Sequence, residues 1–428
     1  MRILVLTNLY PPDVIGGYEL GCKQVVDALL ARGHEVLVLT TAPRTPAPSV
    51  PHVDRSMHLG DVWNHYLFTR SRPVTAHLLQ AQSGLVSAQN VHALARAAER
   101  FRPDVAYVWN LVGVGGVGLM AAVQHLGIPW AWHLMDDVPL ELCVLGGARP
   151  PALVGELARQ LDGRFLACSR QLVDEVEAGG IPLGDRVEIL PNWVVGPPPA
   201  PRSRAYRAGS GDPLRIMAAG QVNRNKGVDI LIEAAALVRA RGRDDFAVDL
   251  YGQADDPSFL ELARRLDLDR HVHFRGPRPQ AELGRLYAEH DLFAFPTWAR
   301  EPFGFAPLEA AWRGCVPLVA MECGFAEWFA AGAHCLKADR TPAAFADAIL
   351  GVLDGAVDLA PIARRAAAAV GRDFHLDALI GRVERALAGA AGGRARPRRA
   401  GSAAEAYRLA LLAEKLARVL VGEMVPAA

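Results

Sequence analysis

Two glutamates stand out as residues that could bind a polyhydroxylated ligand. Glu301 and Glu309 enclose seven residues in the run EPFGFAPLE, which follows a short apolar segment over 292–295 and a loop. Carboxylates accept hydrogen bonds from sugar hydroxyls, so a pair delivered by one strand to the edge of a sheet suits such a ligand. A loop charge and a helix N-terminal charge explain the same residues without a ligand, and composition alone favours that explanation.

A basic loop bounded by glycines is the second candidate site. The run GQVNRNKG over 220–227 leaves an expected strand and opens an expected helix. Gly220 lets the backbone approach a ligand, the helix N-terminus presents free N–H groups, and Arg224 and Lys226 supply cations. The loop therefore suits a diphosphate, although its residue order is not that of a Walker A loop. A turn with solvated basic side chains is the alternative interpretation.

The glycine-rich run GVGGVG over 113–118 is typical of dinucleotide-binding proteins. It follows a strand, opens a helix and precedes a second strand ending at Asp136, near the ~20-residue offset of that fingerprint. The same glycines also suit a tight strand-to-helix connection. An NAD-dependent oxidoreductase is therefore an alternative function, but it leaves Lys226, Glu301 and Glu309 without a role.

Charge and cysteine usage narrow the class of protein. Lys plus Arg and Asp plus Glu both total 46, so no net field draws the chain to nucleic acid. Six cysteines are scattered without a C-x-x-C pair, which is typical of proteins of the reducing cytoplasm.

The longest apolar run, 111–123, is too short to span a bilayer. Neither His133 with Asp136 nor the pair His271 and His273 has recognised metal-ligand spacing, so we expect no metal site.

Strand-like and helix-like segments alternate along most of the chain. A β-branched run at 3–6, a helical pattern over 19–32 and a second run at 36–40 form the first β-α-β unit. A Pro-rich and then Gly/Ser-rich stretch over 196–212 precedes a second series that begins at 214. We therefore predict an α/β fold with two Rossmann-like, doubly wound domains facing an interdomain cleft, plus an appended C-terminal helix.

The end of the chain departs from this alternation and sets the last predicted boundaries. An appended helix there is expected either to dock on its own protein or to contact a partner or the inner face of a membrane. The predicted segments are an N-terminal domain over 1–195, a linker over 196–212, a C-terminal domain over 213–374, a closing helix over 375–388, a flexible linker over 389–402 and an amphipathic helix over 403–421.

Several motifs together resemble retaining glycosyltransferases of family 4, the glycogen-synthase-like group with the GT-B fold. The resemblance covers the chain to about residue 387. It rests on GGYE at 16–19, LLARGHEV at 29–36, ILPN at 189–192, the E-x7-E signature at 301–309, GCVPLVA at 314–320 and GFAE at 324–327. The resemblance implies transfer of a sugar from a nucleoside-diphosphate sugar to a hydroxyl of a glycan, lipid-linked or natural-product acceptor, without a required cofactor or metal.

The resemblance also implies a role for each motif residue. Lys226 contacts the diphosphate, Glu309 the ribose, and Glu301 with the backbone after it the donor sugar. The N-terminal domain takes the acceptor and the C-terminal domain the donor. The implied site residues are Lys226, Glu301 and His133 as catalytic residues and Gly17, Gly220, Arg224, Lys226, Phe303, Gly304, Phe305 and Glu309 as donor-binding residues.

Three positions depart from the family pattern. Gln221 stands where the family carries Arg, Phe325 replaces a second glycine, and His133 is separated from Asp136 where the family has His-Asp. The first departure makes Arg224 a candidate replacement cation, and the second affects the shape of the sugar pocket. A non-catalytic nucleotide-sugar or glycan-binding protein on the same scaffold is therefore a further alternative.

Overall fold

Two parallel sheets organise the chain, each in a unit of its own. Contacts divide the chain into unit 1, over 1–167, 172–190 and 380–428, and unit 2, over 168–171 and 191–379. The computed structural model describes residues 1–60, 85–144, 148–200, 205–206, 213–254, 256–393, 402 and 404–413.

Unit 1 holds a seven-stranded sheet in which every neighbouring pair is parallel, in the order β3-β2-β1-β4-β5-β6-β7. Its central strands are almost fully buried, as expected for a parallel sheet that helices cover on both faces. The strands are β1 (Arg2–Leu6), β2 (Glu35–Thr41), β3 (Val53–Met57), β4 (Val105–Val108), β5 (Trp130–Leu134), β6 (Arg164–Ala167) and β7 (Val187–Ile189).

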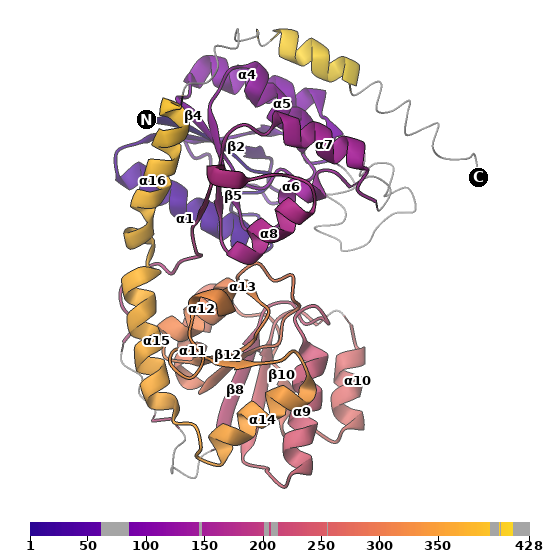
Figure 1. Cartoon of the computed structure of the whole chain (residues 1–428), viewed down its shortest axis with the longest axis vertical. Helices are drawn as coiled ribbons and strands as arrows, with labels where there is room; N and C mark the ends of the chain where they lie inside the picture. Colours follow the sequence, from indigo (N-terminus) through magenta and orange to yellow (C-terminus); the bar gives the residue numbers. More distant parts are fainter. Residues whose placement is uncertain are drawn as a thin grey trace, which may run out of the picture. The chain divides into compact units, whose positions relative to one another are not determined.

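The helices of unit 1 connect these strands in sequence order (Figure 1). Ser87 starts α4 because its side-chain oxygen accepts the Asn90 backbone N–H at 3.3 Å, which satisfies one free amide of the first turn. The helices are α1 (Gly17–Ala31), α4 (Ala88–Phe101), α5 (Gly116–His125), α6 (Val138–Glu141), α7 (Pro151–Gln160) and α8 (Arg170–Ala178), with a short 3₁₀ turn at Gly184–Arg186.

Unit 2 holds a six-stranded parallel sheet in the order β10-β9-β8-β11-β12-β13. Successive strands step outward in one direction from β8 to β10 and in the other from β11 to β13. The strand order therefore reverses between β8 and β11, where open α/β sheets bind ligands. The strands are β8 (Leu214–Ala219), β9 (Phe246–Tyr251), β10 (Val272–Phe274), β11 (Leu292–Phe295), β12 (Val316–Ala320) and β13 (Leu336–Ala338).

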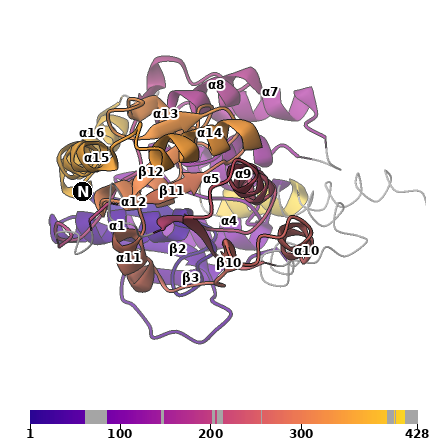
Figure 2. The same ribbon diagram turned by 90° about the horizontal axis from the view of Figure 1, so that it is seen from below.

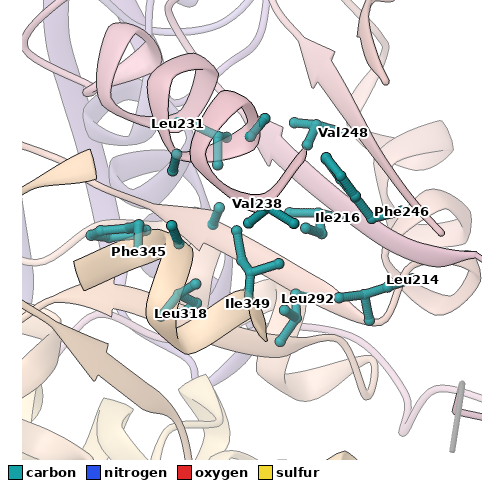
Figure 3. Packing of buried hydrophobic residues seen from close by; sticks show 14 of the residues in the cluster. Leu214, Ile216, Leu231, Val238, Phe246, Val248, Leu292, Leu318, Phe345 and Ile349 are labelled. Atoms are coloured by element: carbon teal, nitrogen blue, oxygen red, sulfur yellow. The ribbon is translucent and has the colours of Figure 1, made fainter. Parts of the chain in front are cut away.

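The core of unit 2 lies between its sheet and the helices α9 and α14, which lie side by side in Figures 1 and 2. Phe345 and Ile349 of α14 belong to one cluster of buried side chains with strand residues such as Ile216 and Leu318 (Figure 3). This apolar layer fixes the strand ends that carry the loops described below. The helices are α9 (Val228–Ala240), α10 (Ser258–Arg265), α11 (Gln280–Glu289), α12 (Phe305–Trp312), α13 (Gly324–Trp328), α14 (Pro342–Leu353) and α15 (Leu359–Asp373).

The C-terminal boundaries differ from the predicted ones. The last long helix, α16, runs over Leu376–Gly392. The closing helix, which was predicted over 375–388, therefore continues into the segment predicted as a flexible linker over 389–402. The alanine-rich run after Leu387 continues the helix because alanine is the best helix former, and Gly389 lies close to the Arg164 side chain.

The two segments predicted as linker and appended helix are described only in part. Residues 404–413 are helical, and 414–421 of the predicted helix lie outside the described residues, as do 394–401. Residues 201–204 and 207–212 of the predicted interdomain linker also lie outside them. Among the helices that the structure describes, each is too short or too polar to cross a bilayer.

Candidate active site

Two loops at one edge of the unit 2 sheet carry the basic run and the first glutamate. One loop leaves β8 after Ala219 and contains Lys226, and the other leaves β11 after Phe295 and contains Glu301. Because β8 and β11 are parallel neighbours, their carboxyl ends meet at the same edge. The fold thereby brings together two segments that are 75 residues apart in sequence.

Hydrogen bonds between the loops hold them in register. The Trp298 backbone N–H donates to the Asn225 carbonyl at 2.7 Å. Arg340 bridges the same two loops, since its Nε donates to the Pro296 carbonyl at 3.1 Å and its Nη2 to the Arg224 carbonyl at 2.8 Å. Sequence reasoning missed Arg340, because one arginine after a strand carries no signal of its own.

Two glycines allow this close approach. Gly227 has φ +68°, and a Cβ at this position would lie 1.9 Å from the Pro296 carbonyl oxygen. Gly304 has φ +94°, and a Cβ there would lie 2.9 Å from the Phe295 ring. Positive φ and a close neighbour both select glycine at these two positions.

Lys226 and Glu301 form an ion pair where the loops meet. The Lys226 ammonium donates to Glu301 Oε2, and the Thr297 hydroxyl donates to the same oxygen at 3.0 Å. The Glu301 side chain is 10% exposed and that of Lys226 is 31% exposed, so the cation lies at the open side of the pair. A mostly buried carboxylate needs such partners. A ligand anion that attracts Lys226 would free one acceptor site on Oε2, which would keep its hydrogen bond from Thr297.

A small hollow borders Lys226 on the side of β8. Gly220 has φ +137°, and within the described part of the chain no atom lies within 4 Å of where its Cβ would be. Gly220 is therefore open on its Cα side, while its backbone N–H donates to the Tyr251 carbonyl at 3.0 Å. The hollow is lined by Ala218, Ala219, Gly220, Gln221, Val222, Lys226, Val228, Leu250, Tyr251, Ala294 and Phe295.

Arg224 takes a different direction from Lys226. Its guanidinium pairs with Asp229 in the first turn of α9 at 3.1 Å, and its side chain is 75% exposed. The structure therefore does not join Arg224 to Lys226 and Glu301. Its role as a replacement cation stays a prediction.

Glu309 lies in α12, and protein donors reach both of its carboxylate oxygens. Gln280 Nε2 donates to Oε1 at 2.6 Å, and the Tyr287 hydroxyl donates to Oε2 at 3.3 Å. Burial raises the pKa of the Glu309 carboxyl above its ordinary value, while these two hydrogen bonds and Arg313 act to lower it. The side chain is therefore held within a small polar network, which differs from the solvated helix-end charge considered above.

The residues between the glutamates form the start of α12. Phe303 is buried against Phe325, with ring centroids 5.9 Å apart, and Phe305 meets Trp193 edge to face at 5.8 Å. Phe325 is itself fully buried and stacks on Phe329 at 4.4 Å, so it fills the core behind the loop. Gly304 caps the helix, and the first-turn backbone N–H groups follow it.

Unit 1 carries Gly17 and His133. Gly17 begins α1, where the buried Glu19 carboxylate accepts the Gly16 and Ile15 backbone N–H groups at 2.9 and 3.1 Å. Glu19 of the GGYE motif thus stabilises the turn before the helix. Gly17 lies in unit 1, whereas the loops of Lys226 and Glu301 lie in unit 2, so its predicted contact with phosphates stays a prediction.

His133 lies in the core of unit 1, on β5. It is fully buried, stacks on Trp109 at 4.5 Å, and shares a 2.7 Å hydrogen bond through Nδ1 with the Tyr107 hydroxyl. Burial lowers the pKa of the imidazole to about 3, so the ring is neutral at physiological pH. His133 belongs to unit 1 and the loops of Lys226 and Glu301 belong to unit 2, so its catalytic role stays a prediction.

The glycine-rich run over 113–118 has a packing explanation. A Cβ on Gly115 would lie 2.3 Å from the Ser87 backbone nitrogen, and one on Gly118 would lie 2.7 Å from the Val86 side chain. The segment before α4 therefore packs directly on this loop, and Figure 1 shows α4 beside α5. The glycines permit close packing at the start of α5, which disfavours the NAD interpretation.

Metal ligation has no support from the described side chains. Within them, no group of three or more His, Cys, Asp or Glu side chains could hold a metal ion. His271 contacts Asp244, whereas His273 and His290 both contact Asp249, so these histidines have structural partners.

Comparison with known proteins identifies the family. Residues 16–193 match the family described as "Glycosyl transferase 4-like domain", and residues 213–355 match "Glycosyl transferases group 1". This chain belongs to the family 4 glycosyltransferases. The enzyme class and the family resemblance drawn from the motifs are thereby confirmed.

Individual relatives of this glycosyltransferase agree with the assignment. It is 27% identical over 391 residues to glycogen synthase of Mycobacterium tuberculosis, covering 86% of this chain and 89% of that protein. It is 26% identical over 331 residues to D-inositol 3-phosphate glycosyltransferase of Arthrobacter, covering 72% of this chain and 74% of that protein.

Solved structures confirm the GT-B fold. Sucrose-phosphate synthase from Thermosynechococcus elongatus matches with a TM-score of 0.71 and 18% identity, covering 91% of this chain and 99% of that one. HepE of Anabaena, solved with UDP-glucose, matches with a TM-score of 0.63 and 18% identity, over 91% and 99% of the two chains. The predicted α/β architecture with two Rossmann-like domains is therefore correct.

Proposed function

We propose that this glycosyltransferase is a retaining enzyme that moves a sugar from a nucleoside-diphosphate sugar to a hydroxyl acceptor. The observation that carries the proposal is the Lys226–Glu301 pair, held by Thr297 at the carboxyl ends of β8 and β11. A cation and a carboxylate thus lie side by side, near the open Cα side of Gly220. The diphosphate of such a donor requires a cation, and its sugar requires a hydrogen-bond acceptor for the hydroxyls.

Donor binding would redistribute the hydrogen bonds of this pair. A diphosphate in the hollow attracts the Lys226 ammonium, which then stabilises the negative charge that grows on the leaving group. Glu301 keeps its bond from Thr297 and gains a free acceptor site for a donor-sugar hydroxyl. Glu309 accepts the ribose hydroxyls. HepE was solved with UDP and with UDP-glucose, which makes these two molecules the first probes for this chain.

Retention is the finer part of the proposal. In the mechanism implied by the family resemblance, the acceptor hydroxyl attacks from the face that the leaving diphosphate vacates, without an assigned protein nucleophile. The anomeric configuration of the first product, followed by proton NMR during turnover, tests this directly. An inverted product would contradict the retaining assignment while leaving the donor site intact.

The acceptor belongs to a broad class. The two relatives named above act, by their names, on a glycan and on an inositol phosphate, so hydroxyl acceptors of both kinds belong in a screen. A non-catalytic binding protein would bind the nucleotide sugar and release no sugar to water or acceptor. Hydrolysis or transfer of the bound donor therefore separates the enzyme from that alternative.

Two substitutions test whether Glu309 binds the ribose and Glu301 binds the donor sugar. Glu309→Gln should weaken UDP binding about tenfold or more, because hydrogen bonds to charged groups contribute roughly 1.5–3 kcal/mol and ~1.4 kcal/mol is a factor of ten. Glu301→Gln should leave UDP binding equal or tighter, because it removes the carboxylate that competes for Lys226. The same variant should lose the extra affinity that the glucose of UDP-glucose provides, together with turnover.

Calorimetry with UDP and UDP-glucose measures these effects, with ADP, GDP and thymidine diphosphate included to find the preferred base. The exposed Glu322, which follows β12, offers a matched control, and Glu322→Gln should bind both ligands like the wild type. If Glu301→Gln and Glu309→Gln behave like Glu322→Gln with every nucleotide, the glutamates are ordinary charges and the site assignment is wrong.

A further inference from the structure

The carboxylate of Glu309 is already hydrogen-bonded by two protein side chains that differ in their freedom to move. Tyr287 and Gln280 both come from α11 and donate to different oxygens, at 3.3 and 2.6 Å. The shorter of the two bonds comes from the amide of Gln280. A ribose that binds Glu309 must therefore share or replace donors that are in place beforehand.

Tyr287 is a fixed donor. Its side chain is 1% exposed, and its ring meets Phe293 of β11 at 5.7 Å between centroids. Its hydroxyl reaches Glu309 Oε2 from a buried ring. Moving it would expose a large apolar ring, so the bond to Oε2 holds whether or not a nucleotide is bound.

Gln280 is an exchangeable donor. It is the first residue of α11 and its side chain is exposed, so it can rotate into water at little cost. The Nε2 group that it offers to Oε1 is a neutral donor, like the hydroxyl of a ribose. Gln280 therefore holds Oε1 with a donor on the exposed side of Glu309, which a ribose hydroxyl could replace.

We propose that Tyr287 positions Glu309 for the ribose diol, and that Gln280 occupies the diol's hydrogen-bond site until the ribose displaces it. The inference rests on the proposed function, because it assumes that Glu309 binds a ribose. It goes further by assigning two residues outside the E-x7-E signature to nucleotide recognition. It also predicts opposite effects of the two residues on affinity.

The test compares UDP with 2′-deoxy-UDP, which lacks one hydroxyl of the diol. The wild-type chain should prefer UDP about tenfold, because the missing hydroxyl leaves a charged acceptor short of one partner. Tyr287→Phe should reduce this preference to about threefold or less by weakening UDP binding, while 2′-deoxy-UDP binding changes little. Gln280→Ala should bind UDP two- to fivefold more tightly, because its competing donor is gone.

Tyr206→Phe is a matched control in the same unit. The Tyr206 hydroxyl donates to the Gly314 carbonyl, so its loss should leave the preference for UDP unchanged. A general loosening of the fold would weaken the binding of UDP and of 2′-deoxy-UDP equally. A positioning role of Tyr287 would instead change the ratio of their two affinities. If Tyr287→Phe does not fold, the predicted rise in UDP affinity of Gln280→Ala still tests the proposal.

The outcomes separate this inference from the proposed function. A tenfold preference that survives Tyr287→Phe, or UDP binding that weakens in Gln280→Ala, would overturn the inference alone. A wild-type chain that binds no nucleoside diphosphate of the panel would overturn the proposed function as well. If another base is preferred, the same comparison uses that diphosphate and its 2′-deoxy form.

Discussion

Gly227→Ala should separate the two loops that carry Lys226 and Glu301, where we propose the donor site. Gly227 precedes α9, and its added Cβ would meet the Pro296 carbonyl oxygen at 1.9 Å. A carbon and a carbonyl oxygen approach no closer than about 3.3 Å, so the loops must move apart by about 1.4 Å. This movement acts directly on the Lys226–Glu301 pair, because the two residues lie on opposite sides of the contact.

The opposite end of the same helix supplies a matched control. Gly242 has φ +81°, close to the φ +68° of Gly227, but the described structure leaves the space around its Cβ position open to 4 Å. Both alanine variants adopt a left-handed conformation that costs roughly 1–2 kcal/mol, offset in part by about 0.4–1 kcal/mol from the stiffer unfolded chain. The difference between the variants therefore isolates the clash with Pro296.

The expected difference is large for both stability and binding. Gly242→Ala should lose about 1 kcal/mol of unfolding free energy and bind UDP normally. Gly227→Ala should lose at least about 2 kcal/mol more, in line with the cost of overpacking a close contact. Its UDP affinity should fall tenfold or more, since misplacement of a site by about 1 Å can cost about a hundredfold in function.

Urea unfolding and calorimetry with UDP measure the two quantities. If Gly227→Ala and Gly242→Ala lose equal stability and both bind UDP normally, the contact with Pro296 does not organise the site. Normal stability with lost UDP binding would instead show that the first-turn backbone binds the nucleotide without help from the Glu301 loop.

Two further predictions concern acid stability and metal dependence. The Glu384 carboxylate of α16 accepts hydrogen bonds from Arg32 Nε and Nη2, each at 2.8 Å, and pairs with His34 Nε2 at 2.9 Å. These hydrogen bonds lower the pKa of Glu384 from 4.5 to about 2. The stabilisation is therefore fully present above pH 4.5 and is lost as the pH falls toward 2, and Glu384→Gln should abolish this part of the acid dependence in pH-dependent urea unfolding. Release of sugar from the preferred nucleotide sugar should continue in EDTA, because in the proposed mechanism Lys226 and the α12 N-terminus supply the positive charge that stabilises the leaving diphosphate. Activity that disappears in EDTA and returns with Mg²⁺ or Mn²⁺ would refute that mechanism.

Local patterns in the sequence determined the architecture and the identity of the motif residues. Apolar runs with strand and helix periods predict two β-α-β series, because each element must bury one face on a common sheet. Glu301, Glu309, Lys226 and Gly220 could be named in advance, since the E-x7-E run and the glycine-bounded basic loop each follow an expected strand, where open α/β sheets bind ligands.

Only the tertiary structure decided which of these residues act together. The pairing of Lys226 with Glu301 depends on β8 and β11 being neighbours, and Arg340 reaches their loops from beyond a third strand. Tyr287 and Gln280 reach Glu309 because α11 packs beside α12. Such contacts join residues that are 22 to 116 positions apart, and no local spacing records them.

The glycine-rich run over 113–118 is a motif whose local spacing suggests a ligand site, whereas the tertiary structure gives its glycines a packing role. Its spacing is typical of a dinucleotide fingerprint, yet Ser87 and Val86 pack on it so closely that glycine is required for packing. Sequence spacing reports where the backbone is free of side chains. Whether a ligand or another part of the chain uses that space is decided by the elements that pack around it, because close-packed cores leave room for one occupant.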